Sequence, residues 1–395
     1  MHQIATKIRF LNDVKVELTY QDGTSDKEPK TNNHKYYPVL DLVRFICAIF
    51  VICIHVFPEG STSEGMGFDS SIPTLLGESS VFALLRVAVP ILFAISGFIL
   101  FKRIKEDESN KWRYIGKYCL RLLFLYVFWY IIAIPITIRD ITTFVSNGDN
   151  SGLIRYIVIT IWKGAPRGYW FLVSLAISVV IANLFNSKKS LIILIVVASL
   201  LYIYGCLNSA YFGLFTLSND PISKFIYTTG EFLELCFCPL EALLFVVIGK
   251  LFANYGTFKM RGNIVILPII YILMVGELFL TMFTKIFVYA NAFFTLPFFV
   301  IFFMNLILRI DVQDEKFIQV MKKLKKVASF SYLFHLEFFY YFYWIFDANG
   351  ITVFKDQFYL AIIPFILVIG LSFGLQTLFE YLSKYKYLKF LKYSY

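Results

Sequence analysis

The sequence predicts an all-α integral membrane protein, a polytopic helical bundle of about ten transmembrane helices with both termini in the cytosol. Its 395 residues are 58% hydrophobic and only 16% charged, whereas soluble domains average about 45–50% apolar and about 25% charged residues. The mean hydropathy is +0.68. Apolar runs of roughly 18 or more residues, long enough to cross a bilayer, recur from Tyr36 to Leu382.

These runs divide the chain into a polar tail, a transmembrane domain and a short basic tail. Residues 1–35 are polar, and their strand-like alternation is too short to build a core. Residues 36–382 form the predicted transmembrane domain. Residues 383–395 interleave Lys and Tyr, which suits the headgroup layer. The predicted spans are 37–57, 81–101, 119–138, 169–186, 189–207, 233–253, 264–283, 287–308, 328–346 and 358–381.

The charges indicate orientation in a membrane rather than nucleic-acid binding. The net charge of +10 comes mainly from Lys and Arg at the ends of apolar runs, where they face the cytosol and anionic lipid. If the N-terminus is cytosolic, most of the basic loops also lie on the cytosolic side. The basic segment 139–168 does not fit this orientation, so its apolar stretch "LIRYIVITIW" is expected to lie on the outer leaflet or dip into it.

The spacing of the cysteines and the absence of common catalytic motifs limit the kinds of reaction that the protein is expected to catalyse. The six Cys lie in or beside apolar segments without the spacing of zinc ligands, so buried free thiols are expected and no metal site is predicted. The sequence contains no phosphate-binding Walker loop and no G-x-S-x-G nucleophile elbow. Any reaction therefore depends on polar groups placed inside the membrane.

The first span contains three such groups, Asp41, Arg44 and His55. Arg44 and His55 are eleven residues apart, about three helical turns, so they share a face roughly 16 Å apart along the axis. Asp41 precedes Arg44 by three residues and can pair with it on the same face. Two interpretations remain open. The residues form a polar stripe facing a wet interior, or an interfacial ion pair and a polar helix end.

Further polar residues lie in later spans. Arg86 stands near the outer end of the second span, followed by Ser96 and Gly97, a small pair that favours close helix packing. His335 lies within the ninth span and Glu241 within the sixth. Buried imidazoles and carboxylates of this kind relay protons or bind polar ligands, or they pair between helices as structure.

At these residues the chain resembles the acyltransferase 3 family of integral membrane acyltransferases. The first span carries the spacing D-x-x-R followed by an apolar run to His. Three further stretches, "VPILFAISGF" (89–98), "YWFLVSLAIS" (169–178) and "SFSYLFHLEFF" (329–339), resemble later motifs of the family in the same order. One motif departs from the pattern. Where the family commonly has R-x-x-R before the third span, Arg121 keeps the second position and Tyr118, beside Lys117, occupies the first.

The resemblance implies an O-acetyltransferase of a bacterial plasma membrane. It would move an acyl group, usually acetyl, from cytosolic acyl-CoA to a hydroxyl of a cell-surface polysaccharide or lipid-linked glycan. His55 would act as base or brief acyl carrier, Arg44 would position the thioester, and Asp41 would orient Arg44. The expected donor-binding residues are Lys102, Arg103, Lys117, Arg121 and Ser96, and the expected acceptor-binding residues are Arg86, Trp170, His335 and Glu241.

A second resemblance suggests transport instead. The membrane portion of the vancomycin-resistance serine racemases is similar to the same family, and "LRVAVPILFAISGF" with "IHVFP" is close to it. That portion is associated with movement of a small amino acid such as serine. Those proteins continue into a soluble racemase domain, which is not expected here because the sequence ends at Tyr395, just past its last predicted span. We therefore expect acyl transfer and keep serine transport as the alternative.

Overall fold

The computed structural model contains helices joined by short irregular segments. Contacts within the chain separate residues 1–36 from residues 37–395, and every helix named below belongs to the second unit. No strand occurs in the described residues, so the all-α prediction is confirmed there. The strand-like pattern of residues 1–35 lies outside them. The structure describes residues 36–56, 71–163, 169–216, 220–233, 239–259, 263–286, 291–349 and 361–395.

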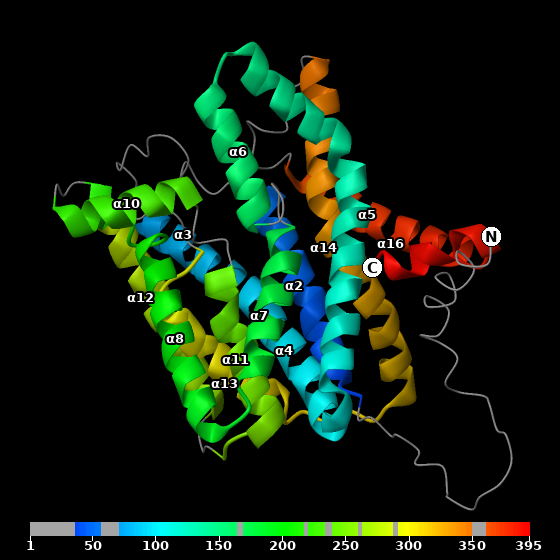
Figure 1. Cartoon of the computed structure of the whole chain (residues 1–395). Coiled ribbons are helices and arrows are strands. Elements are labelled where there is room, and N and C mark those ends of the chain that lie inside the picture. Colours follow the sequence, from blue (N-terminus) through cyan, green and yellow to red (C-terminus); the bar gives the residue numbers. More distant parts are fainter. Residues whose placement is uncertain are drawn as a thin grey trace, which may run out of the picture. The chain divides into compact units, whose positions relative to one another are not determined.

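The helices follow one another closely along the chain (Figure 1). Two short 3-10 helices accompany them, η1 (Glu108–Asn110) and η4 (Lys386–Tyr393). The α-helices are α2 (Pro38–Val56), α3 (Ile72–Leu85), α4 (Ala88–Glu106), α5 (Lys111–Ser146), α6 (Asn150–Lys163), α7 (Trp170–Leu184), α8 (Lys188–Leu207), α9 (Gly213–Thr216), α10 (Pro221–Leu233), α11 (Pro239–Tyr255), α12 (Asn263–Phe283), α13 (Leu296–Ile307), α14 (Glu315–Ala348) and α16 (Ile362–Leu382).

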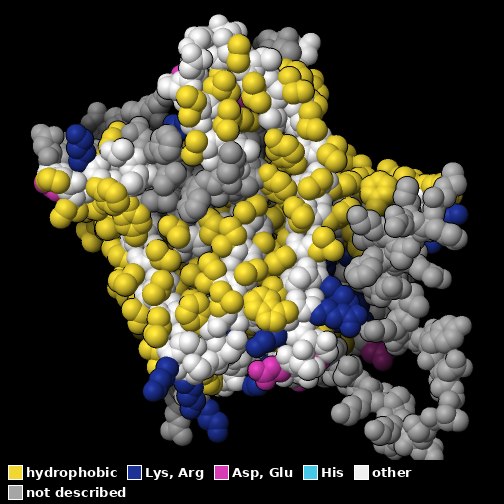
Figure 2. All heavy atoms as spheres, in the orientation of Figure 1, with side chains coloured by type: hydrophobic (Ala, Val, Ile, Leu, Met, Phe, Trp, Pro, Cys, Tyr) yellow, Lys and Arg dark blue, Asp and Glu magenta, His cyan; other side chains and the backbone are white. Residues whose placement is uncertain are grey.

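The protein is a multi-pass membrane protein by the length and composition of its helices. Figure 2 shows a face covered largely by hydrophobic side chains, with Lys and Arg side chains toward its lower edge. On α5 the exposed apolar residues recur at helical spacing, as lipid-facing residues do: Leu120, Leu123, Val127 and Ile131. The candidate spans are 38–56, 72–106, 108–146, 188–207, 265–283 and 362–382. The predicted number of about ten spans is therefore not confirmed, although a helix overlies each predicted range.

Several predicted spans differ from the observed helices in length. The second is divided into α3 and α4 at Arg86 and Val87. Pro90 lies in the first turn of α4, where its missing N–H costs no helical hydrogen bond. The fourth and eighth are the short apolar helices α7 and α13. At 1.5 Å per residue they extend only about 22 Å and about 18 Å, less than the roughly 30 Å of a bilayer core.

Two helices are longer than predicted. α5 has 36 residues and α14 has 34, so each is more than 50 Å long at about 1.5 Å per residue and extends beyond the hydrocarbon layer. α5 continues through the first part of 139–168, and α6 packs against it, with Phe144 and Tyr156 5.7 Å apart between ring centroids. The apolar stretch in this segment is therefore helical and forms the second arm of a helical hairpin, and its position relative to the outer leaflet stays a prediction.

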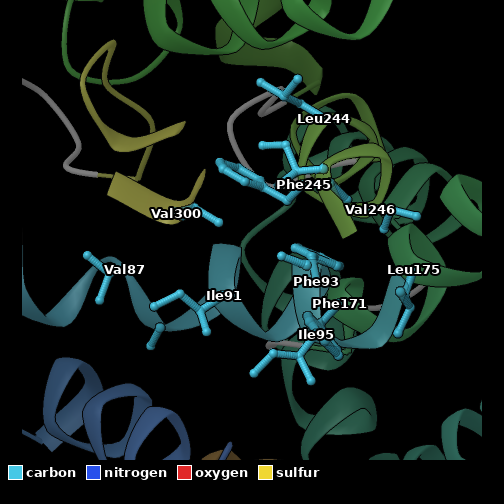
Figure 3. Close-up of a cluster of buried hydrophobic side chains, with 14 of the residues drawn as sticks. Val87, Ile91, Phe93, Ile95, Phe171, Leu175, Leu244, Phe245, Val246 and Val300 are labelled. Atoms are coloured by element: carbon cyan, nitrogen blue, oxygen red, sulfur yellow. The ribbon is translucent and has the colours of Figure 1, made fainter. Parts of the chain in front are cut away.

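The core is centred on the contact between α4 and α11 (Figure 3). Gly97 makes this contact possible, because a Cβ at Gly97 would lie 2.5 Å from the carbonyl oxygen of Val246. Small residues at such crossings let backbones approach closely inside membranes. Beside the crossing, Phe93 stacks on Phe171 of α7 with 4.4 Å between ring centroids. The packing interpretation of "SG" is thus confirmed for Gly97.

α2 and α14 lie alongside each other, one of the most extensive helix contacts in the described structure. Both run in the same direction, because the N-terminal part of α2 meets the first half of α14 and the C-terminal end of α2 meets its middle. This pairing positions the candidate site, since it brings polar residues of the first span together with residues that follow almost three hundred positions later.

Candidate active site

The polar residues of α2 occupy one side of the helix, as their spacing predicts. The Arg44 guanidinium donates a hydrogen bond from Nη1 to Asp41 Oδ1 at 2.8 Å. The Asp41 side chain is 2% exposed and that of Arg44 is 18% exposed. A buried carboxylate is costly unless it is paired, so Arg44 neutralises Asp41. The rest of the guanidinium faces a cavity.

This cavity has a volume of about 360 Å³ and combines cationic groups with an apolar wall. Arg44 of α2, Arg121 of α5 and Lys325 of α14 lie within electrostatic range of one another. Arg103 of α4 completes the cationic lining. Within the part of the chain that the structure describes, no Asp or Glu side chain lines the cavity. The other lining residues are Ala48, Leu92, Ser96, Ile99, Leu100, Tyr118, Leu122, Leu125, Phe171, Leu172, Leu175, Ala328, Ser329, Tyr332, Leu333 and Tyr395.

The bend between α4 and α5 fixes one side of the cavity. Arg103 lies over the ring of Tyr114, 4.9 Å from the centroid, and the Tyr114 hydroxyl donates to Asp107 Oδ2 at 3.0 Å. Ser109, Asn110 and Tyr114 all donate to this carboxylate, and these hydrogen bonds hold the pKa of Asp107 below its usual range, with Ser109 contributing most. The bend therefore fixes Arg103 through Tyr114.

The C-terminal segment closes another side. Trp129 donates from Nε1 to the carbonyl of Ser394 at 2.9 Å, and Arg121 donates to the backbone oxygen of Tyr395, the last residue of the structure, at 3.0 Å. Ser394 and Tyr395 are buried, and Tyr395 lines the cavity. Part of the hydrogen-bonding capacity of Arg121 is thus used within the protein.

Beyond the cavity, two histidines meet. The rings of His55 and His335 are 5.2 Å apart between centroids and inclined by 39°. His55 is exposed, whereas His335 is 2% exposed. Tyr332 lines the cavity, and its ring lies 5.9 Å from that of His335. A continuous series of side chains therefore joins the cationic cavity to His55.

The remaining predicted site residues separate into groups. Arg103, Arg121 and Ser96 line the cavity with Arg44, whereas Lys102 and Lys117 are not among its lining residues. Arg86 donates to Asn291 Oδ1 and lies within electrostatic range of His55.

Two others lie elsewhere. Trp170 packs on Phe93 at 6.0 Å between ring centroids. Glu241 is buried in the first turn of α11, in the electrostatic neighbourhood of Tyr202 and Cys206.

Among the polar residues of the cavity, Lys325, Ser329, Tyr332 and Tyr395 were not predicted from the sequence. Lys325 belongs to the segment "MKKLKK". The basic charge of this segment was interpreted as a signal for its cytosolic orientation, so no binding role was assigned to the lysine. Only the pairing of α14 with α2 distinguishes this lysine from its neighbours. For Tyr332 a signal existed, since it precedes His335 by three residues and so shares its helix face.

Comparison with known proteins identifies the family. The model of the acyltransferase domain matches residues 37–381, nearly the whole chain. This chain belongs to the acyltransferase 3 family. The match includes α2, α4, α5 and α14, which carry the cationic residues of the cavity and the histidine pair of this acyltransferase 3 protein.

Two curated relatives of this acyltransferase 3 chain come from Enterococcus faecalis, and both are named amino-acid racemase. One is 23% identical over 190 residues, which are 48% of this chain and 25% of the relative. The other is 27% identical over 186 residues, 47% of this chain and 23% of the relative. The matched segments thus cover about a quarter of each relative's length. No solved structure matches this chain.

Proposed function

We propose that this protein is a membrane O-acyltransferase that takes an acyl group, usually acetyl, from acyl-CoA and transfers it to a hydroxyl of a cell-surface glycan. One observation supports this most strongly. α2 and α14 contribute to a cavity lined by four cationic side chains and also carry a histidine pair, and Tyr332 lies between the cavity and that pair. This arrangement suits a donor that is anionic at one end and reactive at the other.

The cavity accounts for donor binding. Arg44, Arg103, Arg121 and Lys325 supply charge for phosphate groups, to which Arg binds in bidentate geometry. A volume of about 360 Å³ is at the lower end of the roughly 300–1,000 Å³ typical of small-molecule sites. It accommodates the acyl-pantetheine arm, with the nucleotide phosphates at the cationic rim. Leu172, Leu175 and Phe171 provide the apolar wall along that arm.

His55 accounts for the transfer step. Its exposed imidazole accepts the proton of the acceptor hydroxyl while the hydroxyl oxygen attacks the thioester carbonyl carbon. A C–O bond forms, the C–S bond breaks, and the proton held by His55 passes to the thiolate, which departs as free CoA thiol. Arg86, within electrostatic range of His55, is suited to stabilise the oxyanion that develops at the carbonyl.

The alternative is transport of a small amino acid such as serine. The two relatives named amino-acid racemase each align with about half of this chain, and their name points to an amino acid as the ligand class. A polar route through α2 and α14 would serve a small zwitterion as well as an acyl group. The cluster of four cationic groups in the cavity favours a polyanionic ligand instead.

Two measurements on cells with and without the protein separate these functions. Mass spectrometry of base-labile acyl groups on surface glycans should show a loss when the protein is absent, with uptake of labelled serine into membrane vesicles unchanged. Unchanged glycan acylation together with lower serine uptake would replace the acyltransferase proposal with transport. Bacterial plasma-membrane vesicles are the appropriate material, since that is the membrane we propose.

A further inference from the structure

His335 is one of several buried side chains in the described structure with a polar atom that has no hydrogen-bond partner, and it is the one beside His55. Its side chain is 2% exposed, and its Nδ1 lies 2.7 Å from the carbonyl oxygen of Tyr332. A carbonyl oxygen only accepts hydrogen bonds, so Nδ1 carries the proton when the ring is neutral. Nε2 then carries the lone pair. Within the described residues this Nε2 has no hydrogen-bond partner.

The neighbour of that ring is His55. No hydrogen bond joins the two rings in the described structure. Their centroids are 5.2 Å apart and His55 is exposed, so a rotation of the His55 side chain is enough to bring one of its nitrogens toward Nε2. Phe339 packs on the other side of His335, at 6.2 Å between centroids and in edge contact, and provides no polar atom. The buried lone pair of His335 therefore has one imidazole beside it that is able to donate.

We propose that His335 is a positioning residue that accepts a hydrogen bond at Nε2 from an N–H of His55. This inference rests on the proposed acyl transfer for its kinetic consequence. The hydrogen bond fixes which nitrogen of His55 is protonated and leaves the other free to take the proton of the acceptor hydroxyl. When His55 becomes an imidazolium, the bond to His335 becomes charge-assisted and strengthens.

Three substitutions test the role of His335. His335→Phe keeps a ring of similar size but removes the acceptor nitrogen. His335→Gln places an amide oxygen near the position of Nε2 and restores an acceptor. Phe339→Leu alters the packing on the same face of α14 without changing any acceptor, and is the matched control.

The first measurement does not require catalysis. Diethylpyrocarbonate modifies unprotonated imidazole nitrogens, and peptide mass spectrometry distinguishes the sequence's four His, with His2 and His34 as internal references. We expect His335→Phe to slow modification of His55 by about tenfold, the scale of one hydrogen bond. His335→Gln should recover to within about threefold of wild type, and Phe339→Leu should match wild type. An unchanged rate in His335→Phe, or equal slowing in Phe339→Leu, would overturn the proposal.

The second measurement is the kinetics of transfer. His335→Phe should lower kcat with the KM for acyl-CoA unchanged, and His335→Gln should recover much of kcat. If the modification rate of His55 changes as expected but neither the wild-type protein nor any variant transfers acyl groups, the hydrogen bond between the histidines is supported and the proposed acyl transfer is wrong. If transfer requires His55 but His335→Phe behaves as wild type in both measurements, the function stands and the inference fails.

The wild-type protein offers a test that is free of folding defects. Nitrogen-15 spectra of protein labelled at histidine should show the His335 ring protonated at Nδ1 and unprotonated at Nε2. A His335 ring protonated at Nε2 would overturn the proposal directly, whatever the variants do.

Discussion

The imidazole rings of His55 and His335 lie 5.2 Å apart, although they belong to helices near opposite ends of the chain. The contact depends on the side-by-side packing of α2 and α14, which also brings Arg44 and Lys325 to one cavity. This helix pair therefore supplies the histidine pair and two of the four cationic groups of the cavity, and Arg44 and His55 are about 16 Å apart along α2. This separation is the basis of the proposed transfer from donor to acceptor.

Lys325→Gln should weaken binding of the acyl-CoA donor. The substitution removes one of four cationic groups from the cavity. One charge-assisted hydrogen bond contributes about 1.5–3 kcal/mol. Because Lys325 is exposed, we expect the lower end of that range, about a tenfold rise in the KM for acyl-CoA.

Two controls accompany this prediction. Lys326→Gln changes the neighbouring lysine, which pairs with Glu380 at 2.7 Å and does not line the cavity, so its KM should stay near wild type. With acyl-pantetheine, which lacks the nucleotide phosphates, Lys325→Gln and wild type should have equal KM values. A rise of the same size with acyl-pantetheine would show that Lys325 does not bind phosphate.

Gly97→Leu should destabilise the bundle, because its side chain would enter the space occupied by the Val246 backbone. Overpacking of a filled core costs about 1–3 kcal/mol. Thermal unfolding in detergent should therefore occur at a lower temperature. Gly370→Leu is the control, since nothing lies within 4 Å of a Cβ at that position. Equal unfolding temperatures for the two variants would contradict the role of Gly97 in the α4–α11 contact.

Lys250→Met should destabilise the C-terminal end of α7. Lys250 is 2% exposed, and its Nζ donates to the carbonyls of Ala182 and Phe185 at 2.5 and 2.6 Å and to Asn186 Oδ1 at 3.1 Å. Loss of these bonds leaves buried acceptors unpaired, at about 1–3 kcal/mol for each. Lys105→Met also removes a donor to a carbonyl, that of Asn254, but on the surface, where the expected cost is below about 1 kcal/mol. Similar losses for both variants would contradict this account.

Local features of the site could be predicted from the sequence. The first span was predicted at 37–57 and α2 covers Pro38–Val56, because a long apolar run leaves little choice of register. The pairing of Asp41 with Arg44 follows from a separation of three residues on a helix. Arg103, Arg121 and Ser96 were also expected near the donor, and they line the cavity.

Tertiary relationships could not be predicted in this way. Nothing in the local pattern of α14 shows that His335 meets His55, because that contact depends on which helices pack together. Helix lengths failed for a related reason. Hydropathy identifies apolar stretches of about the length of a membrane span. The predicted span was therefore shorter than α14, because the first turns of that helix are polar. The spans predicted at α7 and α13 were longer than the helices themselves.

The central claim is that His55 performs acyl transfer between a donor in the cavity and a glycan acceptor. The most direct test measures base-labile acyl groups on surface glycans by mass spectrometry in cells that make equal amounts of wild-type or His55→Ala protein. We expect His55→Ala to lower glycan acylation to the level of cells without the protein. Acylation at the wild-type level in His55→Ala cells would contradict it.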